Sequence, residues 1–169
     1  RFLSIGDFKI ARAADYEKAC EEAYIIVDPE RRKKLIIQGI EKVAEENGGK
    51  AEITEDLLEE VLYLVEYPTA LCGSFDKKYL EMRDHQRYFP VKDAAGKLLP
   101  LFITVRNGGS EYLDVVQHGN ERVLRARLDD AQFFFDEDRK KSLETHREKL
   151  KTVVFQQGLG TMYEKTERM

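Results

Sequence analysis

The spacing of apolar and polar positions predicts two amphipathic helices early in the chain. The first begins at Asp28-Pro29-Glu30, because aspartate caps free backbone N–H groups, proline fits the first helical position and an acid suits the first turn. Apolar side chains then recur at helical spacing until Asn47-Gly48, which ends the helix. A second helix is predicted from Thr54 through Val65, ahead of Pro68.

A β-hairpin is predicted in the middle of the chain, where the apolar period falls from about 3.6 to about 2. Residues 88–91 lead into a polar turn at 93–96, and residues 98–105 return as the second strand. The short apolar segment Tyr24–Val27 predicts a buried strand ahead of the first helix. A segment of small residues, 69–75, follows the second helix.

The most regular segment of the chain is Gly119–Asp138, which predicts a helix with Asn120 as its N-cap. One apolar stripe at helical spacing is expected to be buried, and it consists of Leu124, Leu128, Ala131 and Phe135. Two interpretations of the remaining face stay open. It is either a solvated face with arginine–acid pairs, each worth about 0.2–0.5 kcal/mol, or an edge that contacts phosphate or a partner through Asn120, Arg122 and Arg125.

The order of these elements predicts an α+β protein. We expect a mixed sheet that includes the hairpin, is packed with several helices and is followed by a helical C-terminal segment. An α+β domain is expected over residues 1–135 and a helical appendage or linker over 136–169, because apolar patterning gives way to charge near this point. The chain opens without methionine and stops after a charged helical pattern, so we expect it to be a fragment.

Composition restricts the class of partner. The chain has 169 residues, of which 42% are hydrophobic and 36% charged, as in a folded and heavily charged globular protein. The net charge of −4 argues against gripping nucleic acid by bulk electrostatics, so an RNA contact requires a local basic face. No apolar run approaches about 18 residues, and Cys20 and Cys72 stand far apart. We therefore expect no membrane span, no disulfide or zinc framework, and a reducing cytoplasm.

The start of the hairpin carries the richest candidate chemistry. Arginine, histidine and glutamine stand there beside two aromatic residues, and such a combination can hold a phosphate backbone and stack on unpaired bases. The alternative is that the aromatic rings belong to the core. An acid–base role for His85 would need a partner that the sequence does not place. The predicted RNA contacts are Arg83, His85, Gln86, Arg87, Arg106, Asn107, Asn120, Arg122 and Arg125.

Catalytic and metal motifs do not emerge from the sequence. The three histidines are too scattered for a zinc site, and Cys72-Gly-Ser-Phe75 lacks the frame of a nucleophile turn. Asp136–Asp138 is interpreted as a helix end before a basic cluster, and the charged run 139–151 as a solvated face with a tRNA-facing role as the alternative. Since no phosphate-binding glycine loop is present, we expect neither a catalytic residue nor a cofactor in this chain.

Short segments in a specific order connect the chain to a known family. They are Arg1-Phe2, Val27-Asp28, Arg31-Arg32-Lys33, Glu66-Tyr67-Pro68, His85–Phe89, Gly119–Asp138 and Leu159-Gly160-Thr161 with Lys165 and Arg168. Over essentially its whole length, the chain resembles the beta subunit of bacterial glycyl-tRNA synthetase. One departure is that Lys78–Glu81 runs straight into Met82, where the family has an apolar, proline-containing strand. We therefore expect that a loop between Glu81 and Met82 is missing from the sequence.

The resemblance implies a tetramer of two alpha and two beta chains. In that enzyme the alpha chain holds the site where glycine and ATP react, and the beta chain chiefly binds tRNA. The resemblance places this fragment in the N-terminal half of the beta chain, with a fold like the editing-type module of the phenylalanyl enzyme's beta chain. Binding or positioning of tRNA(Gly) is the expected role. Docking of the alpha subunit or other beta domains, and editing-type hydrolysis of mischarged tRNA, are the alternatives; DNA and membranes are not expected partners.

Overall fold

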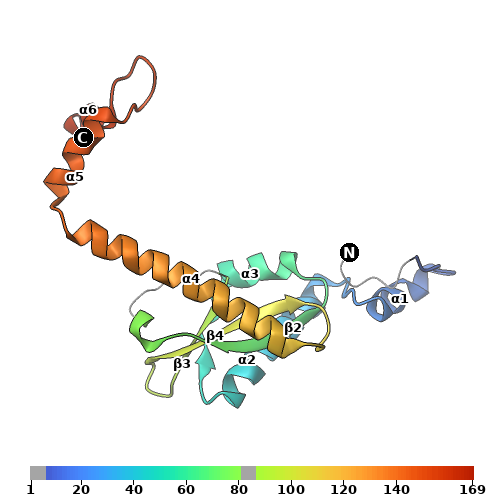
Figure 1. The fold of residues 1–169 in the computed structure, drawn as a ribbon. Helices are drawn as coiled ribbons and strands as arrows, with labels where there is room; N and C mark the ends of the chain where they lie inside the picture. Colours follow the sequence, from blue (N-terminus) through green and yellow to red (C-terminus); the bar gives the residue numbers. More distant parts are fainter. Residues whose placement is uncertain (1–6, 81–86) are drawn as a thin grey trace. The chain divides into compact units, whose positions relative to one another are not determined.

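The computed structural model describes residues 7–80 and 87–169 of this chain (Figure 1). It divides the chain into two compact units, Arg1–Leu128 and Asp129–Met169, which we call unit 1 and unit 2. The loop expected between Glu81 and Met82 falls outside the described residues. Across the described ranges, no helix combines the length and the apolar character needed to cross a membrane.

Unit 1 contains a four-stranded sheet in the order β1-β3-β4-β2. Its elements are a 3-10 turn at Ala13–Asp15, α1 (Tyr16–Glu22), α2 (Pro29–Glu46), β1 (Lys50–Ala51), α3 (Glu55–Leu64), β2 (Pro68–Ser74), a 3-10 turn at Lys77–Tyr79, β3 (Phe89–Lys92), β4 (Leu98–Asn107) and the first part of α4 (Leu113–Arg139). The α+β prediction and the hairpin β3–β4 are confirmed. The expectation of a mixed sheet is corrected, because each of the three described strand pairings is antiparallel.

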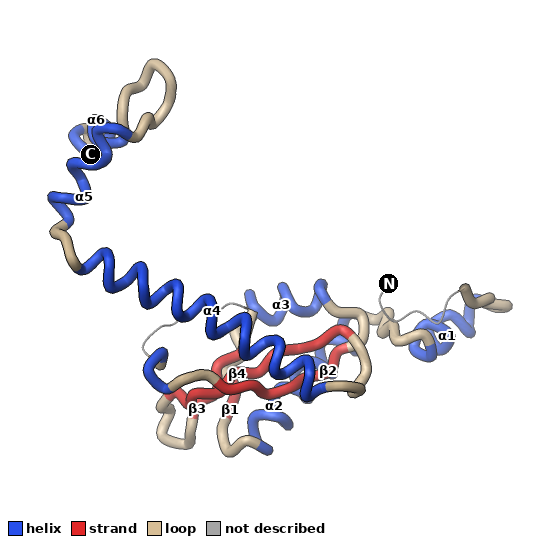
Figure 2. The backbone as a smooth tube through the Cα atoms, viewed as in Figure 1, coloured by secondary structure: helices blue, strands red, loops and turns tan. Residues whose placement is uncertain are grey.

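Helices cover both faces of this sheet (Figure 2). On one face, Ile36 and Ile40 of α2 belong to the core cluster that contains Ile103 of β4 and the buried side of α3. On the other face, Phe102 of β4 packs in a second cluster with Leu124 and Leu128 of α4. Neighbouring strand residues point to opposite faces, so Phe102 and Ile103 join the two clusters through one strand.

The first helix begins as the sequence predicts. The Asp28 carboxylate accepts a hydrogen bond from the Glu30 N–H at 3.0 Å, and Pro29 is the first helical residue. By contrast, Tyr24–Val27 is not a strand. Ile26 is buried, its N–H donates to Glu66 O at 2.8 Å, and its carbonyl oxygen accepts from the Arg32 guanidinium at 2.6 Å rather than from a neighbouring strand. Burial alone therefore produced the apolar signal, without a strand ladder.

Strand β2 occupies the small-residue segment, where no alternating pattern marks it. Gly73 lies opposite Phe102 in the β2–β4 register. A Cβ atom at position 73 would stand 2.3 Å from Cζ of the Phe102 ring, so the ring covers the glycine backbone. The side chain that a periodic pattern would need at this position is excluded by its cross-strand neighbour.

Helix α4 begins at Leu113 rather than at Asn120, so the predicted N-cap is wrong. The Asn120 amide nitrogen donates to Val116 O at 2.8 Å, as an interior helical side chain does. Gly119-Asn120 stays helical because packing outweighs local propensity. Of the predicted stripe, Leu124 and Leu128 are buried, whereas Ala131 and Phe135, which fall in unit 2, are exposed.

Unit 2 is helical, as predicted for the C-terminal segment. It contains the end of α4, then α5 (Leu143–Lys149), a 3-10 turn at Leu150–Thr152 and α6 (Met162–Glu167). A capping box between Thr161 and Glu164 starts α6. No side chain of this unit is buried, and Phe133, Phe134 and Phe135 are all more than half exposed. The predicted division at residues 135 and 136, and the likeness to an editing-type module, stay predictions.

Candidate nucleic-acid interface

The nine predicted RNA contacts do not form one cluster. Three of them, Arg83, His85 and Gln86, lie outside the described residues. The other six occupy three places in unit 1: Arg87 and Asn120 line one pocket, Arg106 and Asn107 lie at the end of β4, and Arg122 and Arg125 lie on the exposed side of α4. The sequence therefore named residues from three surfaces, of which the first lines a pocket.

The pocket that contains Arg87 and Asn120 has a volume of about 240 Å³. We call it the α4 pocket. Thr104 and Val105 line it, beyond the last register pair of β3 and β4, Phe89–Ile103. The remaining lining comes from the end of α3, from the residue before β3 and from one side of α4: Val61, Leu64, Val65, Tyr88, Val123 and Arg127. Five of the ten lining residues are thus aliphatic, and the other five, which are polar or aromatic, include two arginines.

Arg87 is held at the pocket by its backbone and by an ion pair. Its φ angle is 64°, a left-handed conformation that is rare for residues other than glycine. Its Nε lies 2.6 Å from Oε1 of Glu60 on α3. The Arg87 side chain remains 65% exposed, so its guanidinium can still reach a phosphate.

Arg127 is the pocket residue that sequence reasoning did not select. Asn120, Val123 and Arg127 fall at i, i+3 and i+7 of α4, which places them on one side of the helix. That spacing was available in the sequence. From the helical pattern alone, Arg127 was expected only to form ion pairs at the surface. The other wall of the pocket comes from residues far away in the chain, so the pattern could not show that Arg127 lines a pocket.

Tyr88 connects the pocket to the core. Its ring packs edge-on against Phe102, with centroids 4.6 Å apart, and its hydroxyl donates to Oδ1 of Asn120 at 3.2 Å. Burial raises the pKa of Tyr88, although the Arg127 charge opposes this, so the hydroxyl stays protonated as a donor. Phe89 is fully buried in the core. The two aromatics thus differ: Phe89 is a core residue, and only Tyr88 presents a polar atom to the pocket.

Arg106 and Asn107 have structural contacts at the far end of β4. The Asn107 Oδ1 atom accepts from the N–H groups of Glu66 and Tyr67, both at 3.0 Å. The Arg106 guanidinium donates to the backbone oxygen of Glu111. These bonds hold the segment before β2 and the turn after β4. Neither side chain lines the α4 pocket.

Arg122 and Arg125 are exposed, and no hydrogen bond or ion pair joins them to any described residue. The acidic neighbour Glu121 is turned toward β2, where its Oε1 accepts from the N–H and hydroxyl of Ser74 at 2.8 and 3.0 Å. Partial burial would raise the pKa of Glu121, but donation by Ser74 and Gln117 outweighs it and lowers the pKa. Glu121 thus faces β2, whereas the Arg122 and Arg125 side chains face solvent.

Replacing Glu121 with glutamine is expected to make the free energy of unfolding less sensitive to acid. Since the folded pKa lies below the usual value of 4.5, the carboxylate's contribution is complete above that pH and is lost as pH falls through the folded pKa. Urea unfolding at about pH 7 and about pH 4 should show a smaller difference for the variant than for the parent. The exposed Glu59→Gln variant is the matched control, and an unchanged acid loss in Glu121→Gln would contradict the assignment.

Cys72 is the reactive side chain near Glu121. The Cys72 thiol is half-buried, and burial together with the Glu121 charge raises its pKa, which keeps it protonated near neutral pH. Within residues 7–80 and 87–169, no three or more His, Cys, Asp or Glu side chains lie close enough to hold a metal ion. The chemistry gathered at the α4 pocket is therefore that of binding: guanidinium, amide, hydroxyl and aliphatic surface.

Comparison with known proteins gives the family. The family described as glycyl-tRNA synthetase beta subunit matches residues 1–169. The glycine–tRNA ligase beta subunits of Moorella thermoacetica and Clostridioides difficile are 50% and 51% identical over 100% of this chain, and that of Trichlorobacter lovleyi is 52% identical over 99%. The chain spans 26% of the length of each of these relatives. It belongs to the glycyl-tRNA synthetase beta subunit family.

Proposed function

We propose that this chain is the part of a glycine–tRNA ligase that binds or positions tRNA(Gly) through the α4 pocket, with no catalytic centre of its own. The beta subunit names of its relatives support membership of such an enzyme. In this proposal the chain works with an alpha subunit, where glycine and ATP react, and with a second beta subunit. Its own contribution to aminoacylation is to hold the RNA.

The observation that carries the proposal is the pairing of two arginines with an aliphatic pocket. Arg87 and Arg127 line the α4 pocket beside Val105 and Val123, and Asn120 adds an amide group. Guanidinium groups hold phosphates and also stack on bases, whereas an amide can bond a base edge. A pocket of about 240 Å³ suits one base turned out of a stack, but not a duplex. The proposed ligand is thus an unpaired nucleotide of the tRNA.

Charge limits where the RNA can lie. The whole chain carries a net charge of −4, so its overall charge does not attract phosphate and a local basic surface is required. The exposed Arg122 and Arg125 lie on other sides of α4 than the pocket residues Asn120, Val123 and Arg127, so the basic side chains continue around the helix. The RNA backbone is therefore expected to cross over the outer side of α4, with one base in the pocket and neighbouring phosphates at these two arginines.

Filling the pocket tests the proposal. In the full-length beta chain, Val123→Trp should weaken binding of a tRNA(Gly) transcript by about tenfold or more, because one stacked base is worth roughly 1–3 kcal/mol. Val115→Trp is the control, since Val115 lies on the same helix, is 64% exposed and does not line the pocket. Fluorescence anisotropy gives both affinities, and thermal melting checks the fold. Parent-like binding by Val123→Trp would reject the pocket as the RNA site.

A scaffold role is the second candidate, and the apolar surface of unit 2 favours it. Phe133, Phe134 and Leu143 are exposed by 59%, 63% and 83%, which is unusual for soluble surfaces unless another protein covers them. Oxidative footprinting of these side chains in the full-length beta chain, with and without the alpha subunit, tests this role. Protection on adding the alpha subunit would support docking there, and equal oxidation would exclude it.

A further inference from the structure

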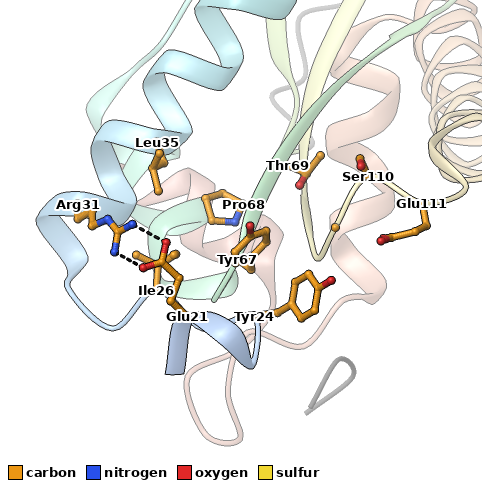
Figure 3. Close-up of a pocket in the computed structure, with 11 residues that line it drawn as sticks. Glu21, Tyr24, Ile26, Arg31, Leu35, Tyr67, Pro68, Thr69, Ser110 and Glu111 are labelled. Atoms are coloured by element: carbon orange, nitrogen blue, oxygen red, sulfur yellow. Dashed lines mark hydrogen bonds and ion pairs between the residues drawn. The ribbon is translucent and has the colours of Figure 1, made fainter. Parts of the chain in front are cut away.

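Unit 1 has a second pocket, of about 480 Å³, whose lining residues differ from those of the α4 pocket. We call it the tyrosine pocket. Helix α1, the start of α2, the start of β2 and the turn before α4 supply its lining: Glu21, Tyr24, Ile26, Arg31, Leu35, Tyr67, Pro68, Thr69, Gly109, Ser110 and Glu111. Figure 3 shows Tyr24 and Tyr67 between the Glu21–Arg31 pair on one side and Ser110 and Glu111 on the other.

The walls of the tyrosine pocket are fixed by specific contacts. The Arg31 guanidinium donates two hydrogen bonds to the Glu21 carboxylate, at 2.8 and 2.5 Å, and so joins α1 to α2. The rings of Tyr24 and Tyr67 meet edge-on, with centroids 5.1 Å apart and planes at 72°. Two aromatic side chains and a bidentate ion pair thus form a wall that exists before any ligand arrives.

Three charged side chains line this pocket, Glu21, Arg31 and Glu111, and together they carry a net charge of −1; the Arg106 guanidinium lies outside the lining, on the backbone oxygen of Glu111. Among the described residues that line the pocket, Arg31 is the one with a positive charge, and it is already paired with the carboxylate of Glu21. The pKa of Arg31 is raised first by that hydrogen bond and charge, and then by the charges of Glu17 and Asp28, so further acids surround the pair. Across the pocket, the Glu111 carboxylate has no hydrogen-bond or ion-pair partner among the described side chains. A second cation would therefore be attracted, and a phosphate repelled.

We propose that the tyrosine pocket binds an arginine side chain from a segment of another polypeptide. A guanidinium group stacks on tyrosine rings and forms a forked pair with a carboxylate, so it matches Tyr24, Tyr67 and Glu111 together. Lysine would satisfy the charge but not the planar stacking. The same charges disfavour RNA here, so this pocket faces a protein partner while the α4 pocket faces tRNA. The assignment is independent of the tRNA proposal, because the two pockets share no residue.

A small probe tests the charge recognition directly. The full-length beta chain, carrying 3-fluorotyrosine at position 24 alone, is titrated with N-acetyl-arginine amide and followed by the fluorine resonance. A saturable shift is expected, and N-acetyl-citrulline amide, which has the same shape without the charge, should give none. Equal shifts with citrulline would overturn the proposal, since shape alone would then explain the binding.

Variants locate the carboxylate that is responsible. Glu111→Gln should weaken binding of the arginine probe by about two- to fivefold, as expected for one exposed charge pair. Glu59→Gln, an exposed change on α3 outside the pocket, should leave it unchanged. Unchanged affinity in Glu111→Gln would overturn the assignment of Glu111. Neither variant should alter tRNA binding, so failure here is distinguishable from failure of the α4 pocket as an RNA site.

A cross-linking experiment identifies the class of partner in the assembled enzyme. A photoreactive benzoylphenylalanine replaces Ser110, which is exposed and lines the tyrosine pocket, in the complex of full-length alpha and beta chains with tRNA(Gly). The proposal expects a cross-linked peptide that carries arginine at or next to the attachment point. Cross-links to tRNA, or only to peptides without arginine, would overturn it.

Discussion

Replacing Phe102 with alanine is expected to lower the free energy of unfolding by about 3–5 kcal/mol, the usual cost of removing a buried phenylalanine ring. The ring is 2% exposed and lies in the cluster with Leu124 and Leu128 that fixes α4 to the sheet. It also covers Gly73 and packs against Tyr88. Alanine would leave a cavity that the glycine opposite has no side chain to fill. Since whole domains are stable by only about 5–15 kcal/mol, the variant loses a large part of that stability.

Urea denaturation followed by circular dichroism measures this loss. Tyr63→Ala is the matched control, because Tyr63 is an aromatic residue of α3 that is 70% exposed, and its change should stay within about 0.5 kcal/mol. The Phe102 variant should also bind tRNA(Gly) less well, because Tyr88 reaches the α4 pocket from the Phe102 ring. A loss below about 1 kcal/mol would show that Phe102 is not the anchor of this face.

Replacing Arg87, Arg122, Arg125 and Arg127 together with glutamine is expected to remove most of the salt dependence of tRNA(Gly) binding. Each phosphate contact to single-stranded RNA contributes about 0.7 to the slope of log affinity against log salt, so four contacts contribute about 3. Between about 50 and 200 mM salt, this corresponds to roughly 50-fold in affinity. The effect exceeds that of filling the pocket, because electrostatic contacts dominate affinity for nucleic acid whereas the pocket contributes one base.

Anisotropy titrations of labelled tRNA(Gly) with the full-length beta chain, over a series of KCl concentrations, give the two slopes. The control replaces four exposed basic residues away from α4, Arg12, Lys18, Lys42 and Lys50, and so changes the net charge equally. A shallower slope only in the variant that lacks Arg87, Arg122, Arg125 and Arg127 would place the phosphates at α4 and the α4 pocket. Parallel slopes for the parent and the quartet variant would move the RNA to another part of the enzyme.

Local signals determined the elements that the sequence predicted correctly. Asp28 caps the first helix, and the polar turn at 93–96 closes the hairpin, because capping and turn formation involve only neighbouring residues. The periodic positions Ile36, Ile40 and Leu124 are buried as their spacing predicts. Such interactions act over a few residues of chain, so the sequence alone carries them.

Only the tertiary structure decided which residues of each element pack against other segments of the chain. Gly73 belongs to a strand because the Phe102 ring lies on it, and Asn120 sits inside a helix because its neighbours on α4 are packed against the sheet. The stripe of α4 stops being buried after Leu128, since burial needs an opposing surface that periodicity does not specify. The α4 pocket likewise brings Arg87 beside Arg127, 40 positions later in the sequence. Spacing along the chain names candidate side chains, but the packing of distant segments determines which of them share one surface.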